Sequence, residues 1–174
     1  RPPRDPRIGR RNPPAYLEEL RESAEPIGRG AGDLRTALRG DLHTHSDWSD
    51  GGSPVDEMMR TAQTMIGHEY CAVTDHSPRL TVANGLTPPE RLRTQLGVIA
   101  ELNAAGNGLR ILTGIEVDIL EDGSLDQDED LLAELDVVVA SVHSKLRAER
   151  SAMTRRMVRA VTNPHVDVLG HCTG

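Results

Sequence analysis

Five short apolar segments of this chain end in His or Glu, and this repetition constrains the fold more than any other feature. The segments are Leu42–His45, Val73–His76, Thr113–Glu116, Ala140–His143 and Val168–His171. Because the carboxyl ends of parallel strands meet at one edge of a sheet or one mouth of a barrel, the residues there are brought together. A single His at a strand end is unremarkable, but five consecutive ends that carry His or Glu predict a metal site.

Helical segments alternate with these predicted strands. Residues 53–66 predict a helix with Ser53 as its N-cap and Pro54 at its first helical position. Residues 87–105 predict a second helix that is capped by Thr87. Shorter helices are expected at 129–135 and 152–161, and strands at 39–45, 70–74, 110–118, 136–143 and 166–170. Repeated βα units with right-handed crossovers give a parallel sheet, so the predicted fold class is α/β.

The spacing of apolar residues predicts which faces of the two longer helices are buried. The expected buried residues are Val55, Met58, Met59, Ala62 and Ile66 in the first helix and Leu92, Leu96, Ile99 and Leu102 in the second. The chain has no Phe, and its only aromatic residues are Tyr16, Trp48 and Tyr70. The core must therefore be built from aliphatic side chains and Met, and 174 residues suit one globular unit.

The N-terminal segment differs in composition from the rest. Residues 1–14 contain five Arg and five Pro, a composition that buries too little apolar surface to offset the entropy of ordering. We expect a flexible arm there, followed by a short helix at 15–25 and a Gly-rich linker. The arm and linker then occupy residues 1–32, and the compact domain occupies residues 33–174.

The number of predicted strands is small for a barrel. Each βα unit uses about 30 residues, and the sequence stops at Gly174, directly after the fifth predicted strand. A barrel of seven or eight strands needs further units. We therefore expect an incomplete, N-terminal portion of a larger barrel, with an unpaired edge where further strands would join.

Charge and cysteine usage narrow the classes of function. The formal net charge of -7 argues against a sequence-independent nucleic-acid binder, and the few aromatic residues leave little for bases to stack on. The chain has two cysteines, Cys71 and Cys172, no signal peptide, and no apolar stretch of about 18 residues. These features predict a cytoplasmic protein with reduced thiols and no membrane contact.

Several of the strand-end residues suit a transition metal. His43 and His45 are two positions apart, so on a strand their side chains leave the same face and can chelate one ion. Asp50 lies in the following loop and could turn back toward them, although alone it is typical of a turn before Gly51. Each remaining His or Glu, taken singly, also fits a structural role. Imidazoles mixed with carboxylates and no thiolate suit Zn²⁺, Mn²⁺ or Fe²⁺ better than Mg²⁺.

The acidic run from Glu116 to Asp136 holds ten carboxylates and no Lys or Arg. We considered a Ca²⁺-binding loop, but the order of its residues does not fit an EF-hand. A solvated loop and helix start is the favoured interpretation of this run.

The order and spacing of these motifs resemble the PHP (polymerase and histidinol phosphatase) superfamily. The matching segments are Asp41–Ser46, Ser49–Gly51, Ala72–Pro78, Gly114–Asp118, Ser141–Ser144 and Val168–His171. The residues of these motifs look most like those in the PHP module of bacterial family X DNA polymerases and in its stand-alone, histidinol-phosphatase-like relatives. The resemblance implies a distorted (βα)7 TIM-like barrel that binds three metals at the strand ends.

The resemblance also implies roles for individual residues. The first metal would be held by His43 and His45, the second by Glu116, His143 and His171, and the third by Asp50 and His76, with Glu116 bridging the first two. Glu116 and His143 are the expected catalytic residues. The family's last motif, an Asp-x-His, has no counterpart here, which would leave two sites short of a ligand. Clustered divalent ions would activate a bridging hydroxide for attack on a phosphoester.

Other polar residues next to the strand ends are weaker candidates. Arg79, Lys145 and Arg147 lie just beyond strand-end ligands and could bind phosphate, although solvated loop cations are the simpler interpretation. Asp75 and Asp118 could orient ligands from outside the metal shell.

Three functions remain open from the sequence. The first is a metal-dependent phosphoesterase that acts on a small phosphate monoester. The second is a 3′ to 5′ exonuclease or 3′-phosphatase that acts on DNA, which the Arg-rich arm and the polymerase-linked resemblance favour. The third is an inactive, metal-binding structural module.

Overall fold

The computed structural model describes residues 31–80, 83–88, 90–106 and 108–172 of the chain. It divides into two units, Arg1–Leu38 and Arg39–Gly174. In the first unit the described element is helix α2 (Ala31–Ala37), after which the Leu38 amide donates to the Leu34 carbonyl at 3.1 Å. The flexible arm and the short helix expected within residues 1–30 lie outside the described residues.

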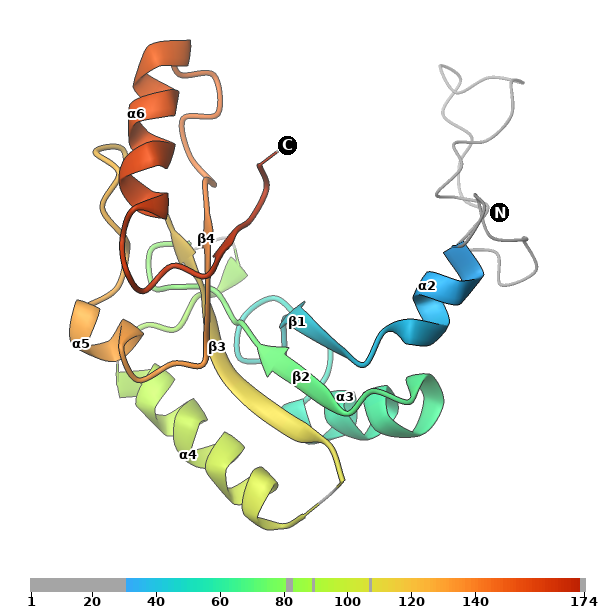
Figure 1. Ribbon diagram of the computed structural model, residues 1–174. Helices are drawn as coiled ribbons and strands as arrows, with labels where there is room; N and C mark the ends of the chain where they lie inside the picture. Colours follow the sequence, from blue (N-terminus) through green and yellow to red (C-terminus); the bar gives the residue numbers. More distant parts are fainter. Residues whose placement is uncertain (1–30, 81–82, 89, 107, 173–174) are drawn as a thin grey trace, which may run out of the picture. The chain divides into compact units, whose positions relative to one another are not determined.

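The second unit is built on five parallel strands that neighbour one another in chain order. They are β1 (Gly40–Thr44), β2 (Tyr70–Val73), β3 (Arg110–Asp118), β4 (Val137–Ser141) and β5 (Val168–Leu169). The strands curl into a half-barrel with helices between them (Figure 1). This confirms the predicted α/β class and the partial TIM-like barrel.

A helical segment links each pair of strands. These elements are α3 (Val55–Thr61) with η2 (Ala62–Ile66), α4 (Glu90–Ala104), α5 (Glu129–Leu132) and α6 (Arg150–Val161). Figure 1 shows α4 and α5 on the same side of β3 and β4. The connection from β2 to β3 thus crosses the helix-covered side of the sheet, as expected for parallel strands.

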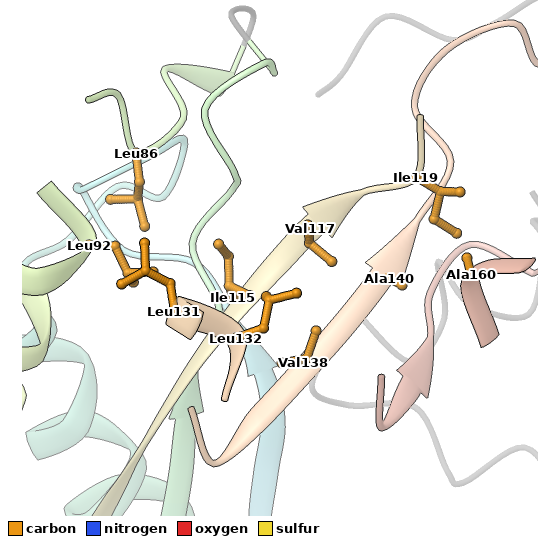
Figure 2. Close-up of a cluster of buried hydrophobic side chains, with 10 residues drawn as sticks. All are labelled: Leu86, Leu92, Ile115, Val117, Ile119, Leu131, Leu132, Val138, Ala140 and Ala160. Carbon is orange, nitrogen blue, oxygen red and sulfur yellow. The ribbon is translucent and has the colours of Figure 1, made fainter. Parts of the chain in front are cut away.

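The largest apolar cluster lies between β3, β4 and the helices that cover them. Its members are Leu86, Leu92, Ile115, Val117, Ile119, Leu131, Leu132, Val138, Ala140 and Ala160. Figure 2 shows the two α5 leucines, Leu131 and Leu132, between Leu92 and the strand residues Ile115 and Val138. Because side chains alternate along a strand, the residues between these positions face the other side of the sheet.

Three local expectations about the helices are wrong in detail. The first residue of α3 is Val55 and no side chain caps it, so Ser53 is not an N-cap. The Thr87 hydroxyl donates to the Pro78 carbonyl at 2.9 Å, and α4 begins only at Glu90. Ile66 is 61% exposed, because the chain widens to a π-helix from Ala62 and the apolar face changes phase.

None of the helices within the described residues is long and apolar enough to cross a membrane.

Candidate metal centre

The pleat of three neighbouring strands explains how the candidate ligands come together. On β3, Ile115 and Val117 pack into the helix-covered core, so Glu116 between them points to the opposite side. The strand direction of β2 continues to His76, which pairs with Glu116 as an isolated parallel bridge. Two residues beyond the end of β4, His143 continues the same alternation. Side chains from separate βα units therefore converge beyond the carboxyl ends of the strands.

The carboxylate of Glu116 is the centre of this cluster, and its side chain is 1% exposed. Its Oε2 atom lies 3.8 Å from His43 Nε2, 3.3 Å from His45 Nε2 and 3.1 Å from His76 Nδ1. Its Oε1 atom lies 3.3 Å from His143 Nε2 and 3.1 Å from His171 Nε2. Five imidazoles thus surround one buried carboxylate.

Asp50 joins the cluster from the loop after β1. Its two oxygens lie 3.5 Å from His45 Nδ1 and 3.5 Å from His76 Nε2. The loop turns tightly beneath it, because a Cβ on Gly51 would come within 2.1 Å of the His45 carbonyl oxygen. Only glycine fits there, so the turn that positions Asp50 depends on Gly51.

The donor atoms suit metal ions in number, chemistry and spacing. Three groups have ligand atoms that all lie within 4.8 Å of one another: His43, His45 and Glu116; His45, Asp50 and His76; His76, Glu116 and His143. Two donors bound tetrahedrally at about 2.1 Å from one ion lie about 3.4 Å apart. The contacts around Glu116 are close to this spacing.

Unpartnered buried atoms support the same interpretation. Within the described residues, no hydrogen bond reaches His45 Nδ1, His76 Nδ1 or Glu116 Oε1, although all three atoms are buried. Buried polar atoms in folded proteins are normally paired. Neutral imidazole nitrogens and carboxylate oxygens are also the donors that Zn²⁺, Mn²⁺ and Fe²⁺ accept, so the residues fit these ions.

Burial and contacts between neighbouring side chains shift the pKa values of the Glu116 carboxyl and of the imidazoles around it. Burial alone would raise the pKa of the Glu116 carboxyl, but the adjoining His143, His45 and Ser141 side chains outweigh it and hold this pKa well below its usual range. Burial lowers the pKa of both His43 and His76. These two imidazoles are therefore held in the neutral form, which is the form that binds a metal.

The pKa of His143 is raised, in contrast to the pKa of His43 and His76. Its Nδ1 lies 3.4 Å from Asp118 Oδ1, and its backbone amide donates to the same oxygen at 3.2 Å. Contact with Asp118, and then with Glu116, raises the pKa of His143 to about 9. Asp118 thus reaches a candidate ligand directly, in the manner of an orienting carboxylate.

Thr74 orients His43 and has no counterpart among the expected site residues. Its hydroxyl lies 2.9 Å from His43 Nδ1 and donates to the Thr44 carbonyl at 3.1 Å. This contact holds Nδ1 of the His43 ring at Thr74, so that Nε2 is the ring nitrogen that lies toward Glu116.

Asp75 does not contact the neighbouring His76 but binds the loop that carries Asp50. Its oxygens accept hydrogen bonds from Ser46 and Ser49, and from Gln95 on α4. Ser46, Ser49 and Gln95 were not expected in the site. The sequence did indicate that Gln95 is unusual, because it lies on the same helical face as Leu92 and Ile99 and so interrupts an apolar stripe.

The three candidate phosphate-binding residues lie in exposed loops. Arg79 pairs with Asp126, at 3.5 Å between Nε and Oδ1. Lys145 and Arg147 are exposed in the loop between β4 and α6, where Lys145 has a φ of 55°. Across the described part of the chain, no ion pair joins either of them to the candidate ligands.

Comparison with known proteins gives two kinds of relative. The chain is 44% identical over 165 residues to the DNA polymerase/3′-5′ exonuclease PolX of Bacillus subtilis, a match that covers 92% of this chain and 29% of that protein. It is 33% identical to a probable phosphatase of Thermoanaerobacter sp. and 36% identical to one of Acetivibrio thermocellus, each over 75% of this chain. This chain spans 52% and 53% of the length of these two phosphatases.

The PHP domain model matches residues 41–170, which begin in β1 and end just after β5. The matched segment contains every candidate ligand except His171, which follows it directly. Together with the half-barrel and its strand-end cluster of His and Glu, this match shows that the chain belongs to the PHP domain family.

Proposed function

We propose that this chain is a metal-dependent phosphoesterase that hydrolyses a phosphate monoester at the cluster around Glu116. The observation that carries the proposal is the set of five imidazoles within 3.8 Å of this one carboxylate. A neutral imidazole nitrogen and a carboxylate oxygen present lone pairs to each other, so such contacts need a proton or a cation between them. Up to three divalent ions, of Zn, Mn or Fe, would meet this need.

The proposed ligand sets are those that the family resemblance implies. His43 and His45 would hold one ion, and Glu116 would bridge it to a second, held also by His143 and His171. Asp50 and His76 would hold the third. Two groups of neighbouring donors support the first and third sets: His43 with His45 and Glu116, and Asp50 and His76 together with His45.

The chemistry follows from the donor set and the residues around it. When bound, clustered divalent ions lower the pKa of a coordinated water and neutralise charge on phosphate oxygens. Glu116 and His143 are the proposed catalytic residues, and Asp118 holds the His143 ring in position. Arg79, Lys145 and Arg147 are proposed to contact the substrate phosphate from the loops.

A second candidate is processing of DNA 3′ ends, as an exonuclease or a 3′-phosphatase. The observation that favours it is the 44% identity to a relative whose name includes a 3′-5′ exonuclease. Both candidates use the same centre and differ in the substrate that reaches it.

The test is hydrolysis of p-nitrophenyl phosphate by the purified chain, with Mn²⁺ or Zn²⁺ added and then removed with EDTA. We expect turnover that requires the metal and that falls at least about 100-fold in Glu116→Gln, because the bridging carboxylate becomes a neutral amide. Glu121→Gln is the matched control, since Glu121 is an exposed residue in the loop after β3.

The substrate is assigned by a parallel assay on a 3′-phosphorylated and a 3′-hydroxyl oligonucleotide. Faster release of phosphate or nucleotide from DNA than from the small monoester would favour the second candidate. Metal-independent turnover, or full activity of Glu116→Gln, would contradict both.

A further inference from the structure

Asp75 is a completely buried carboxylate in the β2–α4 connection, and four donors occupy it. Oδ1 accepts from the Ser46 amide at 2.8 Å and from the Ser49 hydroxyl. Oδ2 accepts from the Ser46 hydroxyl at 2.6 Å and from Gln95 Nε2 at 2.6 Å. A carboxylate offers about four lone-pair positions. Because all are occupied, Asp75 has none left for a metal ion.

The serine donors belong to the loop that carries Asp50. The loop forms a tight turn after Ser46, because the Ser46 carbonyl accepts hydrogen bonds from the Ser49 amide at 3.1 Å and from the Gly51 amide at 2.9 Å. The Ser46 hydroxyl also accepts from the Trp48 amide at 3.2 Å. Asp75 therefore anchors the 46–51 loop, while the Asp50 side chain remains 48% exposed at its tip.

Among the described residues, Gln95 is the one donor to Asp75 that comes from outside this loop. It lies on α4 among the core residues Leu92 and Ile99 and is completely buried. Its Oε1 atom has no hydrogen-bond partner in the described part of the chain. An apolar residue here would leave no unpaired buried oxygen, so packing alone does not explain the amide. What the amide provides is its donor to Asp75.

We propose that Gln95 is a positioning residue for the third proposed metal site, which Asp50 and His76 would hold. Through Asp75, its amide fixes the loop and so holds the Asp50 carboxylate 3.5 Å from the imidazoles of His76 and His45. The inference rests on the proposed function, because it assumes that this site binds a divalent ion. It adds a residue on a helix that carries none of the proposed ligands.

The test compares Gln95→Met with the wild-type chain in equilibrium dialysis against Mn²⁺, with the bound metal measured by elemental analysis. We expect one equivalent to bind about ten-fold more weakly, because loss of a residue that supports a ligand typically costs 10- to 100-fold in affinity. The remaining equivalents should keep their affinity. Hydrogen exchange of the metal-free chain gives a second readout, in which the Ser46, Ser49 and Gly51 amides should exchange about ten-fold faster.

Asn103→Leu is the matched control, since it also removes an amide side chain from α4. Asn103 pairs with the backbone of Ile111, at 2.8 Å and 2.9 Å, and not with the loop. It should lower thermal stability and leave all metal affinities and the loop amides unchanged.

The outcomes distinguish the positioning role of Gln95 from the proposed function of the metal centre. Unchanged metal affinity and unchanged loop exchange in Gln95→Met would overturn the positioning role alone, as would an equal loss of affinity in Asn103→Leu. A wild-type chain that binds no metal would overturn the proposed function together with this inference.

Discussion

His143 shows how single contacts set the properties of the cluster. Asp118 and Glu116 raise its pKa to about 9, so in the metal-free chain its imidazole is protonated at neutral pH. Because the folded-state pKa is raised, the contribution of charged His143 to the free energy of unfolding is fully present below about pH 6.5. It is lost as the pH rises through about 9.

This shift predicts the pH dependence of metal binding. A metal must displace the His143 proton, so the affinity of the site that contains His143 should rise about ten-fold per pH unit between pH 7 and about 9. Calorimetric titration with Mn²⁺ in two buffers of different ionisation enthalpy measures the released proton. In Asp118→Asn the pKa of His143 falls toward its ordinary value, and the slope above pH 7 should flatten. An equal slope in both chains would contradict the assignment.

At the residue scale, the candidate ligands and the orienting carboxylate Asp118 were readable from the sequence, but Thr74 and Gln95 were not. His43, Glu116 and His143 stand at the ends of apolar runs, and a parallel sheet brings such ends together whatever the loops do. Thr74 and Gln95 act through contacts across 31 and 20 positions of sequence. Nothing in local spacing indicates such partners, apart from the polar interruption that Gln95 makes in its helix.

At the scale of elements, the buried Arg156 side chain connects α6 to the two loops that follow β3 and β4. Arg156 is 3% exposed. Its guanidinium donates to the carbonyls of Ile119, of Leu120 at 2.8 Å and of Ser144 at 2.7 Å. These carbonyls belong to the segments that follow β3 and β4: Ile119 and Leu120 come directly after Asp118, and Ser144 comes directly after His143.

Replacing Arg156 should therefore destabilise the fold. In Arg156→Met the Ile119 and Ser144 carbonyls lose the Arg156 donor, while the Leu120 carbonyl keeps the Gly123 amide at 2.8 Å. We expect a cost of about 2–4 kcal/mol in the free energy of unfolding. Thermal denaturation should show a fall of roughly 5–15 °C for a chain of this size. Arg155→Met, on the exposed side of the same helix, should stay within about 0.5 kcal/mol. A similar loss in both variants would show that helix propensity, and not the carbonyl contacts, is responsible.

Element boundaries show where sequence patterns lose precision. The strand predicted at 110–118 has the observed bounds Arg110–Asp118, because it pairs with β2 along its first half and with β4 along its second half. The last strand, expected at 166–170, is only Val168–Leu169. Its length depends on pairing with β4 and not on its own residues. Helix α4 begins at Glu90 and not after the predicted cap Thr87, because the Thr87 hydroxyl donates its hydrogen bond to the Pro78 carbonyl.

At the scale of the whole molecule, net charge sets a limit on polyanion binding. The formal net charge of -7 repels nucleic acid at long range. We predict that the metal-free chain does not bind fluorescent single-stranded DNA with submicromolar affinity at about 150 mM salt. Anisotropy titrations with and without EDTA measure this. Submicromolar binding in EDTA would mean that an electropositive surface outweighs the net charge, and would move DNA processing ahead of monoester hydrolysis.

Metal binding should also stabilise the whole domain, because the proposed ligands come from five separate βα units and the unfolded chain cannot hold them together. At a free Mn²⁺ concentration 100 times the dissociation constant of a site, binding there adds about 2.7 kcal/mol to the free energy of unfolding. For a domain of this size that raises the melting temperature by roughly 5–10 °C. EDTA should reverse the shift, and His143→Ala should reduce it while leaving the contribution of the site that Asp50 and His76 would form. An equal shift in wild type and His143→Ala would place the bound metal elsewhere, and the proposed centre would then have to be abandoned.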